Sequence, residues 1–201
     1  MKYYISDLHL SCRGQVRGDG PNYDGRPYDS LEEMHRDMRE RWNRKVTNGD
    51  MVYILGDIGM RGKNEELISQ MACLKGRKVL VKGNHDDLSD YRLQQLFAEI
   101  CDYKELHDTA DKVPYKVILS HYPILMWNGQ HRGSILLYGH THNSLEDAFF
   151  QESVAAMNRN PAIRHEGEPV FRAINVGCMN SYMGYEPRSL EELLAAKGDP
   201  A

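Results

Sequence analysis

Five short β-prone segments, each followed within two residues by a polar side chain, constrain the fold of this chain more than any other feature. The segments are rich in Val, Ile, Leu and Tyr, and they cover residues 2–6, 51–55, 78–82, 115–120 and 135–138. Their length and composition are typical of buried strands. Helices are predicted between the first three strands, at 31–46 and 64–74. This alternation favours an α/β core.

The region 31–46 has the clearest helical pattern. Ser30 and Glu33 have the spacing of a capping box at its start. Apolar residues recur there with the helical period, and we expect them in the core: Leu31, Met34, Met38, Trp42 and Val46. Further patterns predict helices at 89–98 and 190–196 and a strand at 170–176. Strands dominate the second half and no linker interrupts the chain, so we expect two packed sheets in one domain, 1–201.

Nine polar residues lie just past the predicted strands, and these are the candidate functional residues. They are Asp7, His9, Asp57, Asn84, His85, Asp86, His121, His140 and His142. Ligands of open α/β sheets bind outside the carboxyl ends of the strands. We therefore expect the nine side chains to meet at one edge of the structure.

The spacing of two candidate pairs indicates that each pair aims at one point. Asp7 and His9 are two residues apart, as are His140 and His142. Residues two apart in an extended backbone face the same side. A glycine precedes three of the strand-end candidates, where it permits a sharp turn and close backbone approach. These glycines are Gly56, Gly83 and Gly139.

The candidate donors are carboxylate, imidazole and amide groups without a thiolate, a set that suits Mn²⁺, Fe or Zn²⁺. Seven candidates exceed the needs of one octahedral ion, which takes about six ligands and keeps water. Two ions about 3.5–4 Å apart fit better, because such a pair clamps both oxygens of a phosphoryl displacement. We expect two divalent cations, with Mn²⁺ ahead of Fe, Zn²⁺ or Ni²⁺.

The order of these residues resembles the calcineurin-like metallophosphoesterases. The matching motifs span residues 7–142 and are D-x-H (Asp7, His9), G-D (Gly56, Asp57), G-N-H-D (Gly83–Asp86), a lone His121 and G-H-x-H (Gly139, His140, His142). The resemblance implies a four-layer α/β/β/α sandwich of two mixed sheets flanked by helices. It also implies a metal-bridging hydroxide that attacks phosphorus in line.

The resemblance further implies a role for each candidate. The ligands of the first metal would be Asp7, His9 and His142. The ligands of the second metal would be Asn84, His121 and His140. Asp57 would bridge the two. His85 would protonate the leaving oxygen or stabilise the transition state, with Asp86 orienting it.

A narrower resemblance points to small phosphoesterases of bacteria and their phages. The stretches that carry it are Arg26–Tyr28, Trp42-Asn43, Tyr53–Asp57 and Ile174–Gly177. The chain departs from that group after His9, where it has Ser11-Cys12-Arg13 and an insertion rich in Gly and Arg. This departure leaves the predicted metal site intact, but it removes the basis for transferring a substrate preference.

Residues 11–29 are interpreted as a long exposed loop that covers the site. Arginine binds phosphate in a bidentate way, although a solvated surface arginine is the commoner case. The candidates of this kind are Arg13, Arg17, Arg61 and Arg132. Asn175 is interpreted as a turn residue rather than a support of the site. The histidines outside the motifs are expected at the surface: His35, His107, His131 and His165.

The composition limits the classes of partner and the compartment that we expect for this protein. The formal net charge is −4, so no basic field marks a general nucleic-acid binder. The four cysteines form no C-x-x-C pair, which favours free thiols in a reducing cytoplasm. No apolar run approaches the ~20 residues of a membrane span. We expect a cytoplasmic protein without a membrane partner, either a monomer or a homodimer.

The leading hypothesis is a metal-dependent phosphoesterase acting on a small phosphate ester, with nucleotides among the candidates. Diesters are favoured over monoesters because small members of the similar superfamily often cleave diesters. Two alternatives remain open. One is a metal-binding scaffold or assembly module of the same fold, against which the intact G-N-H-D sequence counts. The other is a nuclease on DNA or RNA, against which the acidic balance counts.

Overall fold

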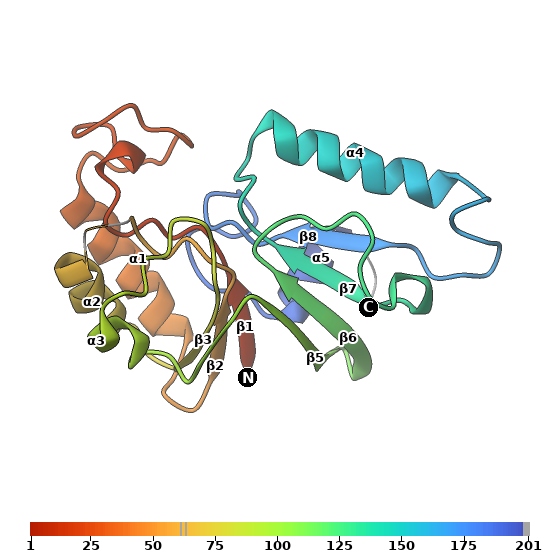
Figure 1. Ribbon diagram of the computed structural model, residues 1–201, viewed down its shortest axis with the longest axis horizontal. Helices are drawn as coiled ribbons and strands as arrows, with labels where there is room; N and C mark the ends of the chain where they lie inside the picture. The colour runs from red at the N-terminus through yellow and green to blue at the C-terminus, as the bar shows by residue number, and fades with distance from the viewer. Residues whose placement is uncertain (61, 63, 199–201) are drawn as a thin grey trace.

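The computed structural model describes residues 1–60, 62 and 64–198. Two four-stranded sheets pack face to face between outer helices (Figure 1). The strands are β1 (Lys2–Ile5), β2 (Met51–Ile54), β3 (Arg77–Val81), β4 (Glu99–Cys101), β5 (Tyr103–Ala110), β6 (Val113–Ser120), β7 (Ile135–Tyr138) and β8 (Arg172–Asn175). The helices are α1 (Leu31–Lys45), α2 (Asn64–Ala72), α3 (Tyr91–Gln94), α4 (Leu145–Arg159) and α5 (Leu190–Ala196), with 3-10 turns η1 (Arg13–Gln15) and η2 (Gln130–Arg132). The predicted α/β/β/α sandwich is confirmed.

The two sheets differ in strand direction. The first has the order β1-β2-β3-β4 and is parallel throughout. The second has the order β5-β6-β7-β8, with β5 antiparallel to β6 and the other pairs parallel. Only the second sheet is therefore mixed, where mixed sheets were expected for both. The parallel pairing places the carboxyl ends of β1, β2 and β3 at one edge.

The ends of β1 and β8 join the two sheets. The Ser6 amide donates to the Val176 carbonyl at 2.8 Å, and the Cys178 amide donates to the Ser6 carbonyl at 3.0 Å. This bridge lies at the carboxyl ends of both strands. It brings the residues after β1 beside those after β7, although more than 130 positions separate them, as in the pair Asp7 and His140.

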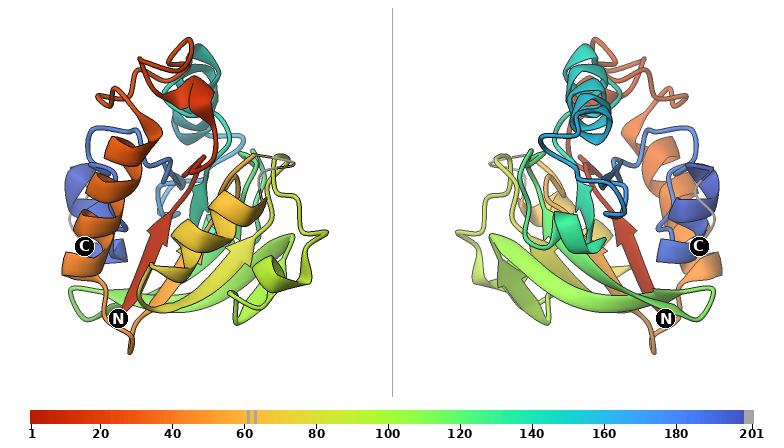
Figure 2. Two further views of the ribbon diagram at one scale, coloured as in Figure 1. Left: turned by 90° about the vertical axis from the view of Figure 1, so that its left-hand side faces the viewer. Right: turned by 90° about the vertical axis from the view of Figure 1, so that its right-hand side faces the viewer.

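Alternation along the second sheet builds two apolar layers. Val117 and Leu119 of β6 face the main core between the sheets. Ile118 points the other way and packs with Phe150 and Val154 of α4 in a separate cluster. Helices α1 and α2 cover the outer face of the first sheet (Figure 2). Successive side chains of a strand point to opposite faces of its sheet, so a strand between two layers buries apolar side chains on both faces.

Four elements depart from the predictions: α3, β4, β5 and α4. The helix expected at 89–98 is only one turn, α3, because the chain turns into β4 and the Ala98 amide pairs with the Lys78 carbonyl at 2.7 Å. Strands β4 and β5 were not predicted; β5 is mostly polar, with Lys, Glu, His, Asp and Thr among its eight residues, so it has no apolar run to indicate a strand. Helix α4 was not predicted either. Its exposed Leu145 and Phe149 obscure the amphipathic pattern.

Single side chains mostly follow the predictions. The expected core residues of α1 are buried, as with Trp42. His35 was expected at the surface, which is wrong: it is buried on the same face of α1 and contacts the Leu10 carbonyl. The other three histidines outside the motifs are exposed as predicted, and the four cysteines are free thiols. In the described part of the chain, no helix has the length and apolar content of a membrane span.

Candidate metal centre

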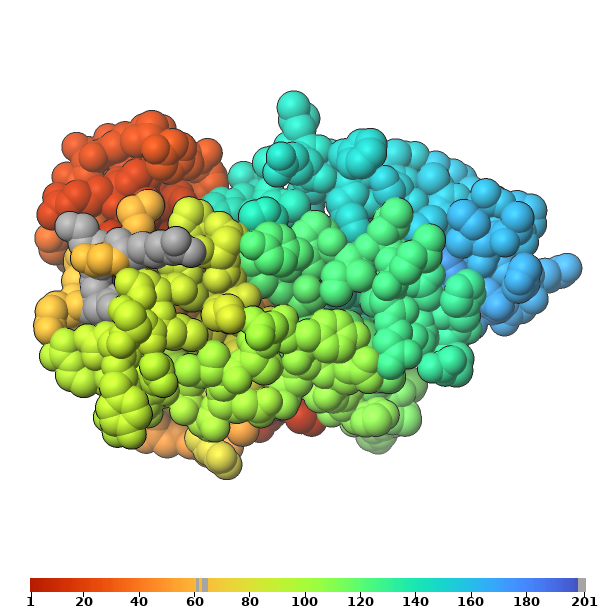
Figure 3. Space-filling view, viewed as in Figure 1, coloured from red at the N-terminus to blue at the C-terminus, as the bar shows by residue number. Residues whose placement is uncertain are grey.

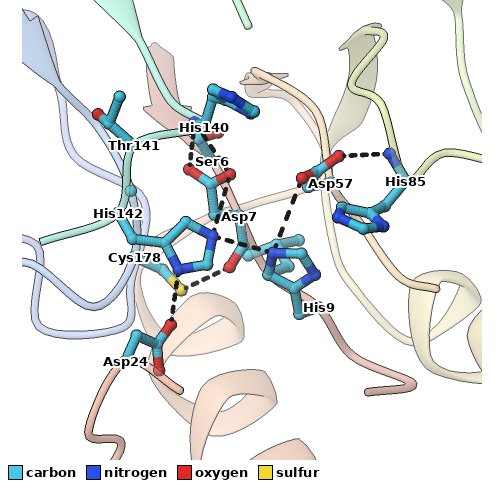
Figure 4. Close-up of polar contacts among 12 residues, drawn as sticks. Ser6, Asp7, His9, Asp24, Asp57, His85, His140, Thr141, His142 and Cys178 are labelled. Atoms are coloured by element: carbon cyan, nitrogen blue, oxygen red, sulfur yellow. Dashed lines mark hydrogen bonds and ion pairs between the residues drawn. The ribbon is translucent and has the colours of Figure 1, made fainter. Parts of the chain in front are cut away.

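The seven predicted metal ligands meet where the two sheets join. Figure 4 labels Asp7, His9, Asp57, His140 and His142 among them. Potential ligand atoms of Asp7, His9 and His142 lie within 4.8 Å of one another, and the same holds for Asp57, His121 and His140. The Asn84 Oδ1 atom is 3.0 Å from both His121 Nε2 and His140 Nδ1. We call Asp7, His9 and His142 the first triad. The second triad consists of Asn84, His121 and His140.

Asp57 lies between the two triads. Its Oδ2 atom is 3.8 Å from His9 Nε2 and 3.7 Å from His121 Nε2. Its Oδ1 atom accepts a hydrogen bond from the His85 amide at 2.9 Å. The carboxylate is thus oriented by the backbone after β3 while one oxygen faces both triads. This is the position that a bridging ligand needs.

The ligands stand on an unusual backbone. Five of the seven have a positive φ, between 47° and 70°: Asp7, His9, Asp57, His140 and His142. Left-handed residues other than glycine cost about 1–2 kcal/mol each, and such strain gathers at functional sites. The pairs two apart therefore converge through left-handed turns rather than through the extended backbone that their spacing suggested.

Two glycines let the turns approach one another. A Cβ atom at Gly83 would lie 2.6 Å from the Asp57 nitrogen and overlap the carboxylate of Asp57. A Cβ atom at Gly139 would overlap the Ser6 hydroxyl and lie 2.7 Å from Asp7 Oδ2. Any side chain at these positions would displace a predicted ligand. The close approach expected from the sequence is confirmed.

The electrostatics of the site fit divalent cations. Burial, together with the Arg26 charge, holds the pKa of His9 well below its usual value. Burial also lowers the pKa of His140, so the surroundings favour the neutral form of both rings, which has a lone pair to offer. Burial raises the pKa of the Asp7 carboxyl, which a nearby cation would reverse.

The first triad also places two imidazole nitrogens in contact. His9 Nε2 and His142 Nε2 are 3.1 Å apart, and Nδ1 of His9 is buried without a hydrogen-bond partner in the described part of the chain. Converging imidazole and carboxylate atoms of this kind are the donor set of Mn²⁺, Fe or Zn²⁺ sites. The residues present therefore fit two such ions.

His85 and Asp86 have different surroundings. The His85 ring is partly exposed and lies edge-on to the His9 ring, with centroids 5.6 Å apart. The Asp86 carboxylate accepts hydrogen bonds from the amides of Asp57, Ile58 and Gly83 at 2.8–3.1 Å. Asp86 thus fixes the turns that carry the bridging ligand. Its predicted action on the His85 side chain stays a prediction.

The sequence model of the calcineurin-like phosphoesterases matches residues 3–177, which include all nine candidates. The chain belongs to the calcineurin-like phosphoesterase family. Membership makes it a relative of hydrolases that act on phosphate esters and typically bind a binuclear metal centre.

Several known proteins are similar to this family member. The Gene 66 protein of Mycobacterium phage D29 is 30% identical over 170 residues, covering 71% of this chain and 79% of the phage protein. The Gene 66 protein of Mycobacterium phage L5 is 25% identical over 172 residues, covering 71% and 78%. A crystal structure of an Aquifex aeolicus protein of unknown function has the same fold, with a TM-score of 0.63, 22% identity and 98% coverage of both chains.

The three arginine candidates that the structure describes do not gather at the centre. Arg13 and Arg17 are exposed and pair with carboxylates of their own loop, at 3.5 Å and 3.7 Å. Arg132 precedes β7, whose other end carries His140, so Arg132 lies at the opposite end of this strand from the centre. The chain crosses from the end of β6 to the start of β7 before Arg132 is reached. Arg61 lies outside the described residues.

Three residues at the centre were missed or misread in the sequence. The loop 11–29 is only partly exposed, because Asp24 and Arg26 are buried beside the first triad. The sequence did offer a signal for this pair: Asp24 and Arg26 have opposite charges, stand two residues apart and precede a proline. Asn175 does form a turn, accepting the Gly177 amide at 2.8 Å, but it also donates to the His142 carbonyl at 2.7 Å. It therefore supports the site as well.

Proposed function

We propose that the protein is a two-metal phosphodiesterase that hydrolyses a small ester in the cytoplasm, with nucleotides among its substrates. The observation that carries this proposal is the Asp57 carboxylate, which lies within 4 Å of a histidine of each triad. A bridging carboxylate is the feature that distinguishes one centre from two separate sites. Four free thiols, two of them buried, suit a reducing compartment.

Each triad would hold one divalent cation, with Asp57 shared between them. Two such ions, when bound, acidify water and neutralise charge on the phosphoryl oxygens. The chain's own residues orient the reaction. The Asp86 carboxylate and the His85 amide hold Asp57 from two sides. The partly exposed His85 ring stands beside His9, where it is available to donate a proton to the leaving oxygen.

A cavity next to the second triad supports a small substrate with an aromatic group. It has a volume of about 470 Å³ and is lined by Lys82, Gly83, Asn84, Asp86, Asp102 and Tyr122. Volumes of roughly 300–1,000 Å³ are usual for small-molecule sites. The segment after β3 (yellow) and the segment after β6 (green) lie side by side on this face in Figure 3.

Tyr122 gives this cavity its chemical character. Its ring is 49% exposed and packs edge-on against the rings of His140 and His121, with centroids 4.6 Å and 4.9 Å apart. A half-exposed ring held in this way offers a stacking surface to a nucleobase or aryl group. Lys82, paired with Asp102 at 2.6 Å, adds a cation at the rim.

The test is hydrolysis of bis-(p-nitrophenyl) phosphate and of p-nitrophenyl phosphate, with Mn²⁺, Zn²⁺ or a chelator. We expect turnover of the diester that disappears with the chelator and in an Asp57→Asn variant. Turnover of the monoester alone would make the protein a phosphatase. Metal binding without turnover of either ester would contradict the proposal and favour the scaffold alternative.

A further inference from the structure

An ion pair from the loop 11–29 stands directly behind the first triad. The Asp24 carboxylate lies 3.2 Å from His142 Nδ1, on the side of the ring away from the other ligands (Figure 4). The opposite nitrogen, Nε2, faces His9 Nε2 at 3.1 Å. Because the Asp24 carboxylate accepts a hydrogen bond from Nδ1–H, the lone pair of the ring is held at Nε2, toward the other two ligands of the triad.

Arg26 completes this support from within the protein. Its guanidinium is fully buried and donates to Asp24 from Nε and Nη2 at 3.1 Å. It also donates to the carbonyls of Asp7 and Leu8, each at 2.8 Å. These carbonyls belong to the strained turn from which Asp7 and His9 project. One ion pair thus contacts His142 by its carboxylate and the Asp7–His9 turn by its guanidinium.

The second triad has a neutral support instead. His121 Nδ1 contacts the Leu55 carbonyl at 2.8 Å, while its Nε2 faces Asn84. A carboxylate behind a metal-binding histidine raises the basicity of the ring more than a carbonyl does, and losing such a partner typically costs about 10–100-fold in metal affinity. The first triad also contains a carboxylate ligand of its own, Asp7, where the second has the amide of Asn84.

We propose that the Asp24–Arg26 pair makes the first triad the tighter of two unequal metal sites. Asp24 and Arg26 are positioning residues that act through His142 and the Asp7–His9 turn. The proposal rests on the metal centre of the proposed function and adds an order of affinities to it. It also explains why the loop 11–29 buries a charged pair, an arrangement that by itself contributes little to stability.

The experiment measures Mn²⁺ binding rather than activity. Metal-free full-length protein is titrated with Mn²⁺ by calorimetry as wild type, Asp24→Asn and Asp19→Asn. Asp19 is the matched control, because it belongs to the same loop and pairs with the exposed Arg13. We expect two classes of site in wild type. Asp24→Asn should weaken the tight site about 10–100-fold and leave the weak site unchanged. Asp19→Asn should change neither.

Other outcomes overturn the proposal in distinct ways. In one such outcome, the Asp24→Asn variant unfolds at a lower temperature and still binds both ions as wild type does. This result would show that the Asp24–Arg26 pair stabilises the fold and does not affect metal binding. Asp24→Glu keeps the charge and shifts the carboxylate by one methylene, so it serves if Asp24→Asn does not fold. Unchanged affinities in Asp24→Glu would equally contradict the proposal. Wild type that binds no Mn²⁺ would instead sink the proposed function.

Discussion

The two triads of the centre differ in how the protein surrounds them. The first is the more buried of the two: Asp7 and His9 are buried, His142 is partly buried, and the Asp24–Arg26 pair backs it from the loop side. The second borders the cavity at Tyr122, and both Asn84 and His140 are only partly buried. In the function that we propose, this difference divides the work of the centre: the more buried half retains a cation, and the half beside the cavity meets the substrate.

Removing the charge of the ligand that the two triads share should affect both metal sites at once. Asp57→Asn withdraws the charge that faces both triads while the turns around it keep their shape. We expect kcat/KM for the diester to fall by more than about 100-fold. This exceeds the usual effect of losing a residue that only hydrogen-bonds to a metal ligand. Steady-state kinetics with saturating Mn²⁺ measures this. Activity within a few-fold of wild type would remove Asp57 from its bridging role.

Truncating one histidine from each triad should separate the two halves. His142→Ala should lower the affinity of the tight site, whereas His140→Ala should lower that of the weak site. We expect each loss to be at least about 10–100-fold. After dialysis, elemental analysis should find close to one ion per chain in His140→Ala and less than one in His142→Ala. Equal metal contents in the two variants would contradict the difference between the triads.

The turn under Asp57 offers a milder perturbation. Gly83→Ala places a methyl group against the Asp57 carboxylate and backbone, so the turn must shift. Overpacking of this kind costs about 1–3 kcal/mol, measurable as a loss of unfolding free energy in urea. Gly49→Ala is the matched control, since its nearest neighbour would be the Thr47 hydroxyl at 3.8 Å. Comparable losses in both variants would show that Gly83 has no special contact.

The smallest expected effect concerns the open side of the second triad. Tyr122→Ala removes the half-exposed ring from the cavity rim. If that ring stacks on substrate at about 1 kcal/mol, KM for an aryl diester should rise roughly fivefold with little change in kcat. Tyr91→Ala removes a similarly exposed ring from α3 and should leave KM unchanged. An unchanged KM in Tyr122→Ala would show that this cavity does not bind the substrate.

The metal ligands could be predicted from the sequence because each lies beside a strand end, and strand ends are local signals. Short apolar runs before Asp7, Asp57 and Asn84 fix both the strands and their parallel alignment. His35 could have been placed too. It stands four residues after Leu31 and three before Met38, so it lies on the buried face of α1 that these two residues share.

The rest depends on contacts distant in sequence. Nothing near Asp24 indicates that its partner will be His142, because the meeting requires β1 and β8 to join first. Helix α4 carries exposed apolar residues that break its pattern, and β5 owes its conformation to pairing with β6. The left-handed turns are likewise imposed by hydrogen bonds such as that from the His140 amide to Asp7.

The most direct test of a shared metal centre is electron paramagnetic resonance of the protein titrated with Mn²⁺, in wild type and Asp57→Asn. Two ions sharing a carboxylate about 3.5–4 Å apart are magnetically coupled. We expect two bound ions per chain in wild type, the first binding more tightly, and a coupled spectrum that Asp57→Asn loses. A single bound ion, or two ions without coupling in wild type, would contradict a shared centre.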